Sequence, residues 1–183
     1  MVTKQVCAES GAADMLQEDF SLEKEVVDLL TASHMTVSVV ESCTGGMLSA
    51  RLVNVAGISE VYRQGFITYA NEAKTELVGV KEETLKNYGA VSAECAGEMA
   101  EGAAKRTGAD VTVSVTGIAG PGGGTQQKPV GLVYIACCVR QKTTIKRCLF
   151  SGSRLQVREA STEAALMLMR SCILEYKEAS ENM

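Results

Sequence analysis

The sequence predicts an α/β sandwich built on a mixed central sheet. From residue 21 onward, segments with helical spacing of apolar residues alternate with short β-branched segments. Two of the strand-like segments lead directly into glycine-rich loops. The last two strand-like segments are joined by a short polar link, which indicates an antiparallel pair beside strands of parallel type.

The first half of the chain is predicted to begin with a helix, a strand and a second helix. In "SLEKEVVDLLTASH" the apolar residues have helical spacing, and Ser21 is a suitable N-cap. The alternating, β-branched "TVSVV" predicts a strand over 36–40. "MLSARLVNVAG" predicts a helix closed by Gly57. A strand "GFITYA" follows, and then helices over 71–80, 81–89 and 92–108, with Asn71 and Ser92 as N-caps and Gly89 and Gly108 at helix ends.

The second half is predicted to complete the sheet. A strand over 110–117 runs into the loop "GIAGPGGGTQQKP", two paired strands cover 130–139 and 143–150, and a long helix over 153–178 closes the fold. We find no internal repeat and no linker that would divide the chain. We therefore expect one domain over 21–178, preceded by a flexible arm over 1–20 whose residues are mixed and polar.

Composition excludes several classes of protein. The chain has 183 residues, 46% hydrophobic and 22% charged, which is typical of a globular domain. A net charge of −4 argues against a broad nucleic-acid-binding surface. No apolar segment approaches the ~20 residues of a membrane span, and the first residues lack a signal peptide, so we expect a cytoplasmic protein. The seven cysteines are predicted to be reduced core residues, and a zinc site is improbable because His34 is the only histidine.

Two glycine-rich loops are predicted to meet at one edge of the sheet. "ESCTGG" follows the strand 36–40, and "TGIAGPGGG" follows the strand 111–115. Ligands of open α/β sheets bind beyond the carboxyl ends of strands. The turn at Gly45–Gly46 opens a helix whose free N–H groups favour either a phosphate or the oxyanion of an acyl-transfer intermediate. Two purely structural turns are the alternative. Neither loop matches a P-loop, a GxGxxG or a GxSxG motif.

Ser42 and Cys43 are both candidate nucleophiles, and a nucleophile needs a base. His34 precedes the strand and is expected at its opposite end, so a serine activated by a neutral lysine remains. Lys74 fits, since the positive end of a helix dipole and burial both oppose an ammonium in the first turn. Lowering a lysine pKa from ~10.4 to ~7–8 takes roughly 3–5 kcal/mol. The Tyr69 hydroxyl is a candidate proton relay or oxyanion donor, and Cys43 is interpreted as a packing residue.

Five segments in order resemble the CinA C-terminal domain family, the family of the nicotinamide mononucleotide (NMN) deamidases called PncC. They are "VVESCTGG", "GFITYANEAK", "GVKEETLKNYGAVS", "SVTGIAGPGGGTQQKPVG" and "LFSGSRLQVREAS", and the resemblance covers roughly Leu22 to Leu174. It implies a three-layer α/β/α sandwich. It also implies a nucleophile at Ser42, assistance from Tyr69 and Lys74, and an arginine at Arg154 or Arg158, of which we prefer Arg154. The substrate-binding residues are then expected to be Thr44, Gly45, Gly46, Thr116, Gly117 and Arg154.

The resemblance implies an amidohydrolase with no metal and no cofactor. The reaction would be hydrolysis of NMN to nicotinic acid mononucleotide and ammonia, in pyridine nucleotide recycling. The partner would be this small-molecule substrate, without nucleic acid or membrane, and we expect a homodimer. A non-catalytic nucleotide-binding or partner-binding module is the first alternative, and hydrolysis of another small amide is the second.

Overall fold

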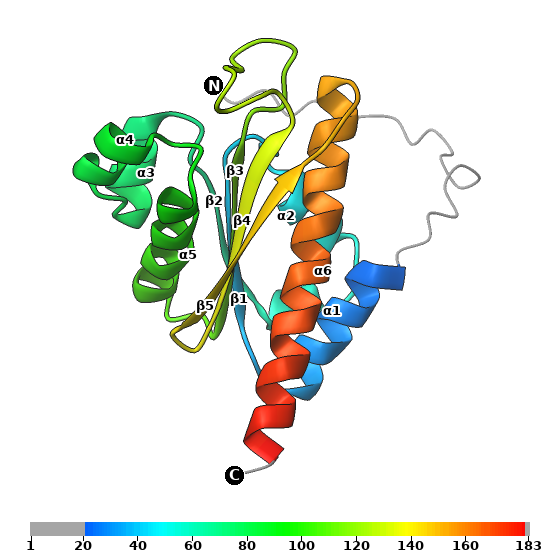
Figure 1. Cartoon of the computed structure of the whole chain (residues 1–183). Coiled ribbons are helices and arrows are strands. Elements are labelled where there is room, and N and C mark those ends of the chain that lie inside the picture. The colour runs from blue at the N-terminus through cyan, green and yellow to red at the C-terminus, as the bar shows by residue number, and fades with distance from the viewer. Residues whose placement is uncertain (1–20, 182–183) are drawn as a thin grey trace, which may run out of the picture.

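One mixed sheet forms the centre of the structure, a computed structural model that describes residues 21–181 (Figure 1). The predicted arm over 1–20 lies outside the described residues. The sheet order is β2-β1-β3-β4-β5. β1 is parallel to both β2 and β3, whereas β4 is antiparallel to both β3 and β5, so the predicted mixed sheet and antiparallel pair are confirmed. The strands are β1 (Val37–Glu41), β2 (Tyr62–Ile67), β3 (Val111–Gly117), β4 (Leu132–Val139) and β5 (Lys142–Leu149).

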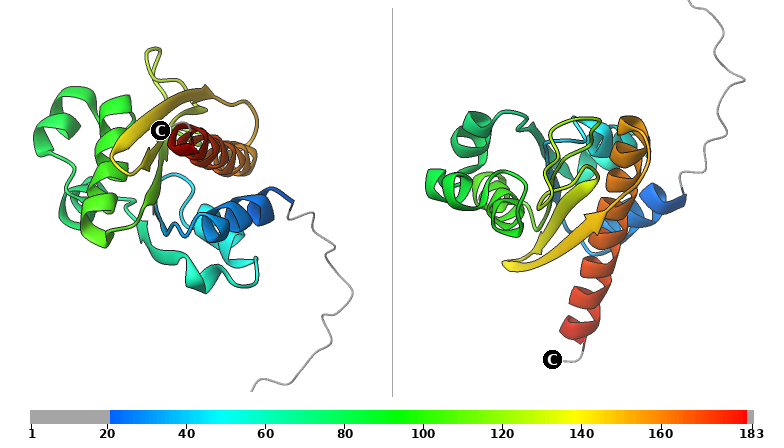
Figure 2. Two further views of the ribbon diagram at one scale, coloured as in Figure 1. Left: turned by 90° about the horizontal axis from the view of Figure 1, so that it is seen from below. Right: turned by 45° about the horizontal axis from the view of Figure 1, so that its top comes forward.

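Helices cover both faces of the sheet and give the three-layer α/β/α sandwich (Figures 1 and 2). α1, α2 and α6 lie on one face, and α3, α4 and α5 lie on the other. The bounds are α1 (Ser21–Ala32), α2 (Met47–Val53), α3 (Asn71–Val78), α4 (Glu82–Tyr88), α5 (Ala93–Thr107) and α6 (Arg154–Glu181), with a 3₁₀ turn over Ile58–Glu60. None of the helices in the described part of the chain is long and apolar enough to cross a membrane.

Local capping chemistry explains where α5 begins and ends. The Ser92 side chain accepts a hydrogen bond from the Cys95 N–H at 3.2 Å, and Gly108 ends the helix with φ +66°. Both positions were predicted, because a serine satisfies a free N–H and glycine tolerates the left-handed conformation.

Several predicted boundaries are wrong by one to four residues; β2, for example, ends at Ile67 rather than at Ala70. α2 ends at Val53, and Gly57 instead precedes the 3₁₀ turn with φ +87°. β2 begins at Tyr62, ahead of the predicted Gly65, because its pairing with β1 extends back to that residue. Asn71 is the first residue of α3, and Ala70 occupies the cap position without a side-chain hydrogen bond.

Burial follows the layers. Every residue of β1 is buried because the strand lies between two others and both of its faces are covered.

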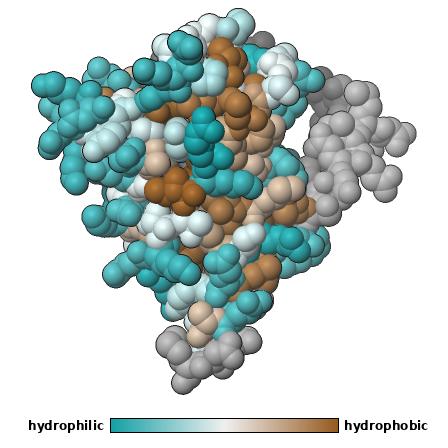
Figure 3. Space-filling view, viewed as in Figure 1, coloured by the Kyte–Doolittle hydropathy of each residue, from teal (hydrophilic) through white to brown (hydrophobic). Residues whose placement is uncertain are grey.

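The six described cysteines are free and buried, which confirms their prediction as reduced core residues, while Cys7 lies outside the described residues. Figure 3 shows hydrophobic side chains gathered near the middle of the face that presents the β4–β5 hairpin; on β5, Ile145 and Leu149 are exposed.

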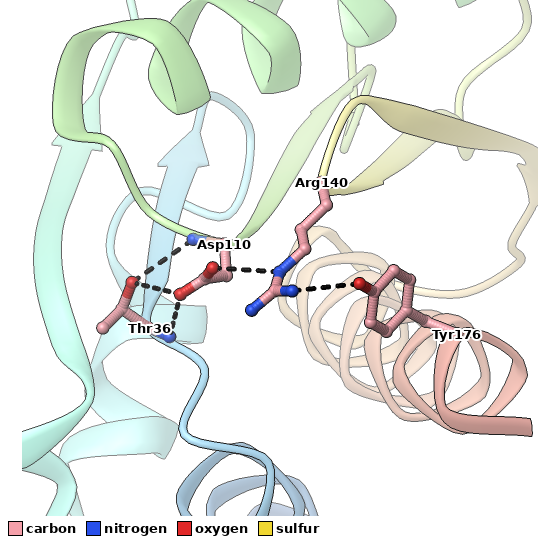
Figure 4. A network of polar contacts seen from close by, with 4 residues as sticks. All are labelled: Thr36, Asp110, Arg140 and Tyr176. Atoms are coloured by element: carbon pink, nitrogen blue, oxygen red, sulfur yellow. Dashed lines mark hydrogen bonds and ion pairs between the residues drawn. The ribbon is translucent and has the colours of Figure 1, made fainter. Parts of the chain in front are cut away.

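A polar network ties the end of the sheet opposite the glycine loops (Figure 4). Asp110, just before β3, accepts hydrogen bonds from the N–H and the hydroxyl of Thr36, each at 3.0 Å. Arg140, after β4, donates to Asp110 at 3.2 Å and to the Tyr176 hydroxyl of α6 at 3.0 Å. The network therefore joins the starts of β1 and β3, the end of β4 and the last turns of α6.

Candidate active site

Ser42 is the first residue after β1, at the carboxyl end of a central strand. Its N–H donates to the Val115 carbonyl of β3 at 2.9 Å, so the backbone at Ser42 is still fixed by the sheet. The chain then turns through Gly45 and Gly46, with φ +60° and +101°, and enters α2. Ser42 is buried, with its side chain beside a cavity. His34 is exposed and precedes β1, so it lies at the other end of that strand, as predicted.

Lys74 contacts Ser42 directly. It lies in the first turn of α3 and is 1% exposed. Its Nζ is 3.2 Å from Ser42 Oγ, 2.7 Å from the Thr68 carbonyl oxygen and 3.4 Å from the Tyr69 carbonyl oxygen. Among residues 21–181 no carboxylate forms an ion pair with this amine. A buried lysine without a counter-ion is the environment that favours a neutral amine.

The electrostatics of Lys74 follow from this burial. Removal of the amine from water lowers the pKa of Lys74, and the nearby Cys95, Cys43 and Glu72 oppose that shift without cancelling it. Cys43 responds in the opposite sense, because burial raises the pKa of its thiol to about 11. Cys43 is therefore a neutral thiol at neutral pH and lacks the thiolate that a cysteine nucleophile needs.

A cavity of about 270 Å³ opens in front of the Ser42–Lys74 pair. The loops after β1 and β3 both line it, as the sequence predicted, together with the start of α3 and the segment before α5. Its lining residues are Ser42, Cys43, Tyr69, Asn71, Lys74, Ala90, Val91, Thr116, Gly117, Ile118, Ala119, Gly120, Gly122, Gly123 and Arg154. Within the described residues no group of three or more His, Cys, Asp or Glu side chains is placed to hold a metal ion.

Arg154 and Tyr69 meet at the rim of this cavity. One guanidinium nitrogen of Arg154 donates to the Tyr69 hydroxyl at 3.0 Å, and another donates to the Gly120 carbonyl at 2.8 Å. Both side chains are exposed, and Tyr69 is 63% exposed. The Tyr69 hydroxyl thus bonds to Arg154, while the contact of Tyr69 with Lys74 is made by its backbone carbonyl. The structure brings Tyr69 to the site without the predicted side-chain relay between Ser42 and Lys74.

Thr116 and Gly117 form the wall at the end of β3. The Thr116 hydroxyl is buried and donates to the Ala90 carbonyl at 2.8 Å, which fixes the segment before α5 against the sheet. A Cβ at Gly117 would lie 2.7 Å from the Leu132 carbonyl oxygen of β4, so only glycine fits there without a shift of the strand. Both residues line the cavity where the sequence placed a binding role.

The chain also matches a known protein family. The model of the CinA C-terminal domain matches residues 19–173. The chain belongs to the CinA C-terminal domain family. Among curated relatives it is 51% identical to a putative competence-damage inducible protein of Caldicellulosiruptor saccharolyticus over 85% of this chain, and 50% identical to a CinA-like protein of Kosmotoga olearia over 84%. These matches span only 38% and 37% of the relatives' own lengths.

Solved structures of the CinA superfamily share the fold. The competence/damage inducible protein CihA of Agrobacterium tumefaciens superposes with a TM-score of 0.81 at 40% identity, over 83% of this chain and 93% of that one. A CinA superfamily protein of Klebsiella pneumoniae gives a TM-score of 0.83 at 32% identity, over 87% and 99%. The family resemblance and the α/β/α fold class predicted from the sequence are therefore confirmed.

Three of the predicted substrate-binding residues lie in the loop after β1 but not at the cavity. Thr44, Gly45 and Gly46 are outside the lining of the cavity. The N–H of Gly46, expected to be free for a ligand, donates to the Glu41 carboxylate at 2.9 Å. At Gly46, a buried carboxylate therefore binds the N–H group that was expected to bind a phosphate or an oxyanion.

The two arginines of α6 are separated by one helical turn and have different contacts. Arg154 lines the cavity, whereas Arg158 donates to the backbone carbonyls of Cys43 and Thr44. The preference for Arg154 over Arg158 as the substrate-binding arginine stays a prediction; Arg154 is the one of the two that lines the cavity. Sequence reasoning assigned no role to the Thr68 carbonyl, or to Ala90 and Val91; the last two belong to the "YGAVS" segment, whose glycine before a helix was the available signal.

Proposed function

We propose that this CinA-family domain hydrolyses the carboxamide of nicotinamide mononucleotide, with Ser42 as nucleophile and neutral Lys74 as its base. The observation that carries the proposal is the 3.2 Å contact between Lys74 Nζ and Ser42 Oγ at the wall of a cavity. A serine hydroxyl within hydrogen-bond reach of a buried amine is the arrangement that nucleophilic catalysis without histidine requires.

The hydrogen-bond partners of Lys74 determine which way the N–H groups and the lone pair of its neutral amine would point. The Thr68 and Tyr69 carbonyl oxygens can only accept, so each takes one N–H of the amine. A neutral amine has two N–H groups and one lone pair. The lone pair then faces Ser42 Oγ and accepts the hydroxyl proton. The lowered pKa of Lys74, which burial causes, favours this neutral form.

The reaction follows from these positions. Lys74 takes the proton of Ser42 as the serine oxygen attacks the carboxamide carbon. The resulting ammonium of Lys74 protonates the nitrogen as the C–N bond breaks, and ammonia leaves. Water, deprotonated by Lys74, then hydrolyses the acyl-enzyme to the carboxylate and free Ser42.

The cavity supports a small anionic substrate. Its volume of about 270 Å³ lies just below the range of roughly 300–1,000 Å³ typical of small-molecule sites. Arg154 at the rim has five N–H donors, of which the two bonds to Gly120 and Tyr69 use only part. The remaining donors suit the phosphate of a mononucleotide, because a guanidinium binds phosphate through paired N–H groups.

The test is ammonia release from NMN by purified protein, beside Ser42→Ala and in the presence of a chelator. Release that is lost in Ser42→Ala and insensitive to chelation supports the proposal. A folded wild type that binds NMN without releasing ammonia contradicts it and supports the non-catalytic binding module. Release from free nicotinamide or glutamine, but not from NMN, would assign a different amide.

A further inference from the structure

The loop that carries Ser42 is irregular but buried, so its backbone groups need partners other than water. Residues 42–44 are buried, yet they belong to no helix or strand. Two charged side chains bond to backbone groups of this loop and of the start of α2 that follows it. They are Glu41, the last residue of β1, and Arg158 of α6. Neither lines the cavity, and the reaction proposed above uses neither.

Glu41 binds N–H groups at the end of the turn and in the first turn of α2. Its side chain is fully buried. One carboxylate oxygen accepts from the N–H groups of Gly46 and Leu48, at 2.9 and 3.0 Å. The other accepts from the N–H and the hydroxyl of Ser49, each at 2.8 Å. These are the N–H groups that the start of α2 leaves without helical partners, and a carboxylate is favourable beside them.

Arg158 holds the carbonyl side of the same turn. Its Nε donates to the Cys43 carbonyl at 3.1 Å, and its Nη2 donates to the Thr44 carbonyl at 2.7 Å. The planar guanidinium suits two adjacent carbonyls, because its donors have a fixed fork geometry. Arg158 lies in the second turn of α6, so it links Ser42's loop to the long helix across the sheet face.

We propose that Glu41 and Arg158 are a pair of positioning residues that hold Ser42 Oγ against Lys74 Nζ. This inference rests on the proposed function for its kinetic readout. Arg158 binds carbonyls inside the turn, and Glu41 binds N–H groups at its end and in the first turn of α2. Loss of either side chain removes hydrogen-bond partners of these backbone groups and lets the turn relax. The Ser42–Lys74 contact of 3.2 Å tolerates little movement. A displacement of about 1 Å at a reacting group costs about 100-fold in rate.

The experiment compares Glu41→Gln, Arg158→Met and Arg158→Lys with the wild type. Glutamine keeps the shape of Glu41 but replaces one accepting oxygen by a donor. Methionine removes both donors of Arg158, whereas lysine restores one. We expect kcat to fall by about 10–100-fold in Glu41→Gln and Arg158→Met, with KM within about twofold. Arg158→Lys should recover part of kcat. Glu159→Gln, an exposed neighbour on α6, is the matched control and should match the wild type.

A second readout does not depend on NMN. A fluorophosphonate reagent reacts with an activated serine hydroxyl, and its rate of labelling at Ser42 reports the Ser42–Lys74 geometry alone. We expect slower labelling in Glu41→Gln and Arg158→Met, partial recovery in Arg158→Lys, and none in Ser42→Ala. A wild type that labels but releases no ammonia, with slower labelling in the variants, contradicts the NMN reaction and keeps the positioning role.

Several results would overturn the inference. Folded variants that keep wild-type kcat and labelling rates would show that the turn needs neither side chain, although the proposed reaction would stand. Loss of folding in Glu41→Gln and in both Arg158 variants, seen by circular dichroism, would assign the pair to stability alone. A wild type that neither releases ammonia nor labels would overturn both proposals, because there would be no reactive Ser42 to position.

Discussion

Replacing Lys74 by methionine tests the state of the buried amine through stability. Burial lowers the pKa of Lys74 from its ordinary value of 10.5. Between the lowered pKa and 10.5 the unfolded chain therefore binds more protons than the folded chain. The free energy of unfolding consequently rises with pH through this window and levels off above it. Lys74→Met removes the titrating group from both states and abolishes this rise.

The size of the effect follows from linkage. Each unit by which the pKa is lowered corresponds to about 1.4 kcal/mol of differential stability. In a domain of this size 1 kcal/mol shifts the melting temperature by about 2–4 °C. The melting temperature of the wild type should therefore rise relative to that of Lys74→Met by about 3–6 °C for each pH unit inside the window. Because Lys74 is 1% exposed, solvent screening removes little of this.

The assay is a series of thermal melts from about pH 6 to pH 11 on the wild type, Lys74→Met and the exposed-lysine control Lys86→Met. The melting temperature of the wild type should begin to rise relative to that of Lys74→Met at the pH that is the acid midpoint of kcat/KM for ammonia release, because one amine governs both. Lys86→Met should parallel the wild type throughout. A difference between wild type and Lys74→Met that stays flat over the whole range would refute the lowered pKa, and with it the role of Lys74 as base.

Three further substitutions test other parts of the structure. Asp110→Asn should cost about 1–3 kcal/mol of unfolding free energy at neutral pH. Burial raises the pKa of Asp110, but the Thr36 hydrogen bonds and Arg140 lower it overall, so this stability is present above pH 3.8 and is lost as the pH falls further. Equal melting temperatures of the variant and the wild type across this range would show that the network contributes nothing. Cys43→Ala should keep ammonia release within about threefold, because burial raises the pKa of Cys43 to about 11; a dead variant would indicate a thiol nucleophile. Gly102→Ala would place a Cβ 1.6 Å from the Val78 carbonyl oxygen, so α3 and α5 must separate, and denaturant unfolding should show a loss of about 1–3 kcal/mol, whereas unchanged stability would contradict that contact.

Sequence alone predicted the features that depend on local chemistry. The Ser92 and Gly108 caps of α5 follow from side-chain and backbone preferences within a few residues. The end of α2 and the start of β2 were wrong because packing and pairing with distant segments decide them. β2 extends back to Tyr62, for example, because its partner β1 offers a parallel edge there.

In the candidate site, too, some features could be predicted from the sequence, whereas others depend on contacts between distant segments. The approach of Lys74 to Ser42 was predicted from the lack of a histidine base together with the resemblance to the CinA C-terminal domain family. The separate contacts of Arg154 and Arg158 could not be predicted, because residues four apart share one helix face and only the approach of α6 to the loop decides which carbonyls each reaches. The sequence also left open whether Glu41 takes part in chemistry or supports the turn; its four hydrogen bonds favour support.

α6 fixes the distance between two contacts with the rest of the domain. Arg158 donates hydrogen bonds to the loop after Ser42 near one end of the helix, and Tyr176 accepts one from Arg140 near the other end, about 27 Å away along the helix axis. An inserted residue between them would turn one end relative to the other by about 100°. Such a helix could not make both contacts at once. The segment between Arg158 and Tyr176 should therefore tolerate substitutions far better than insertions or deletions.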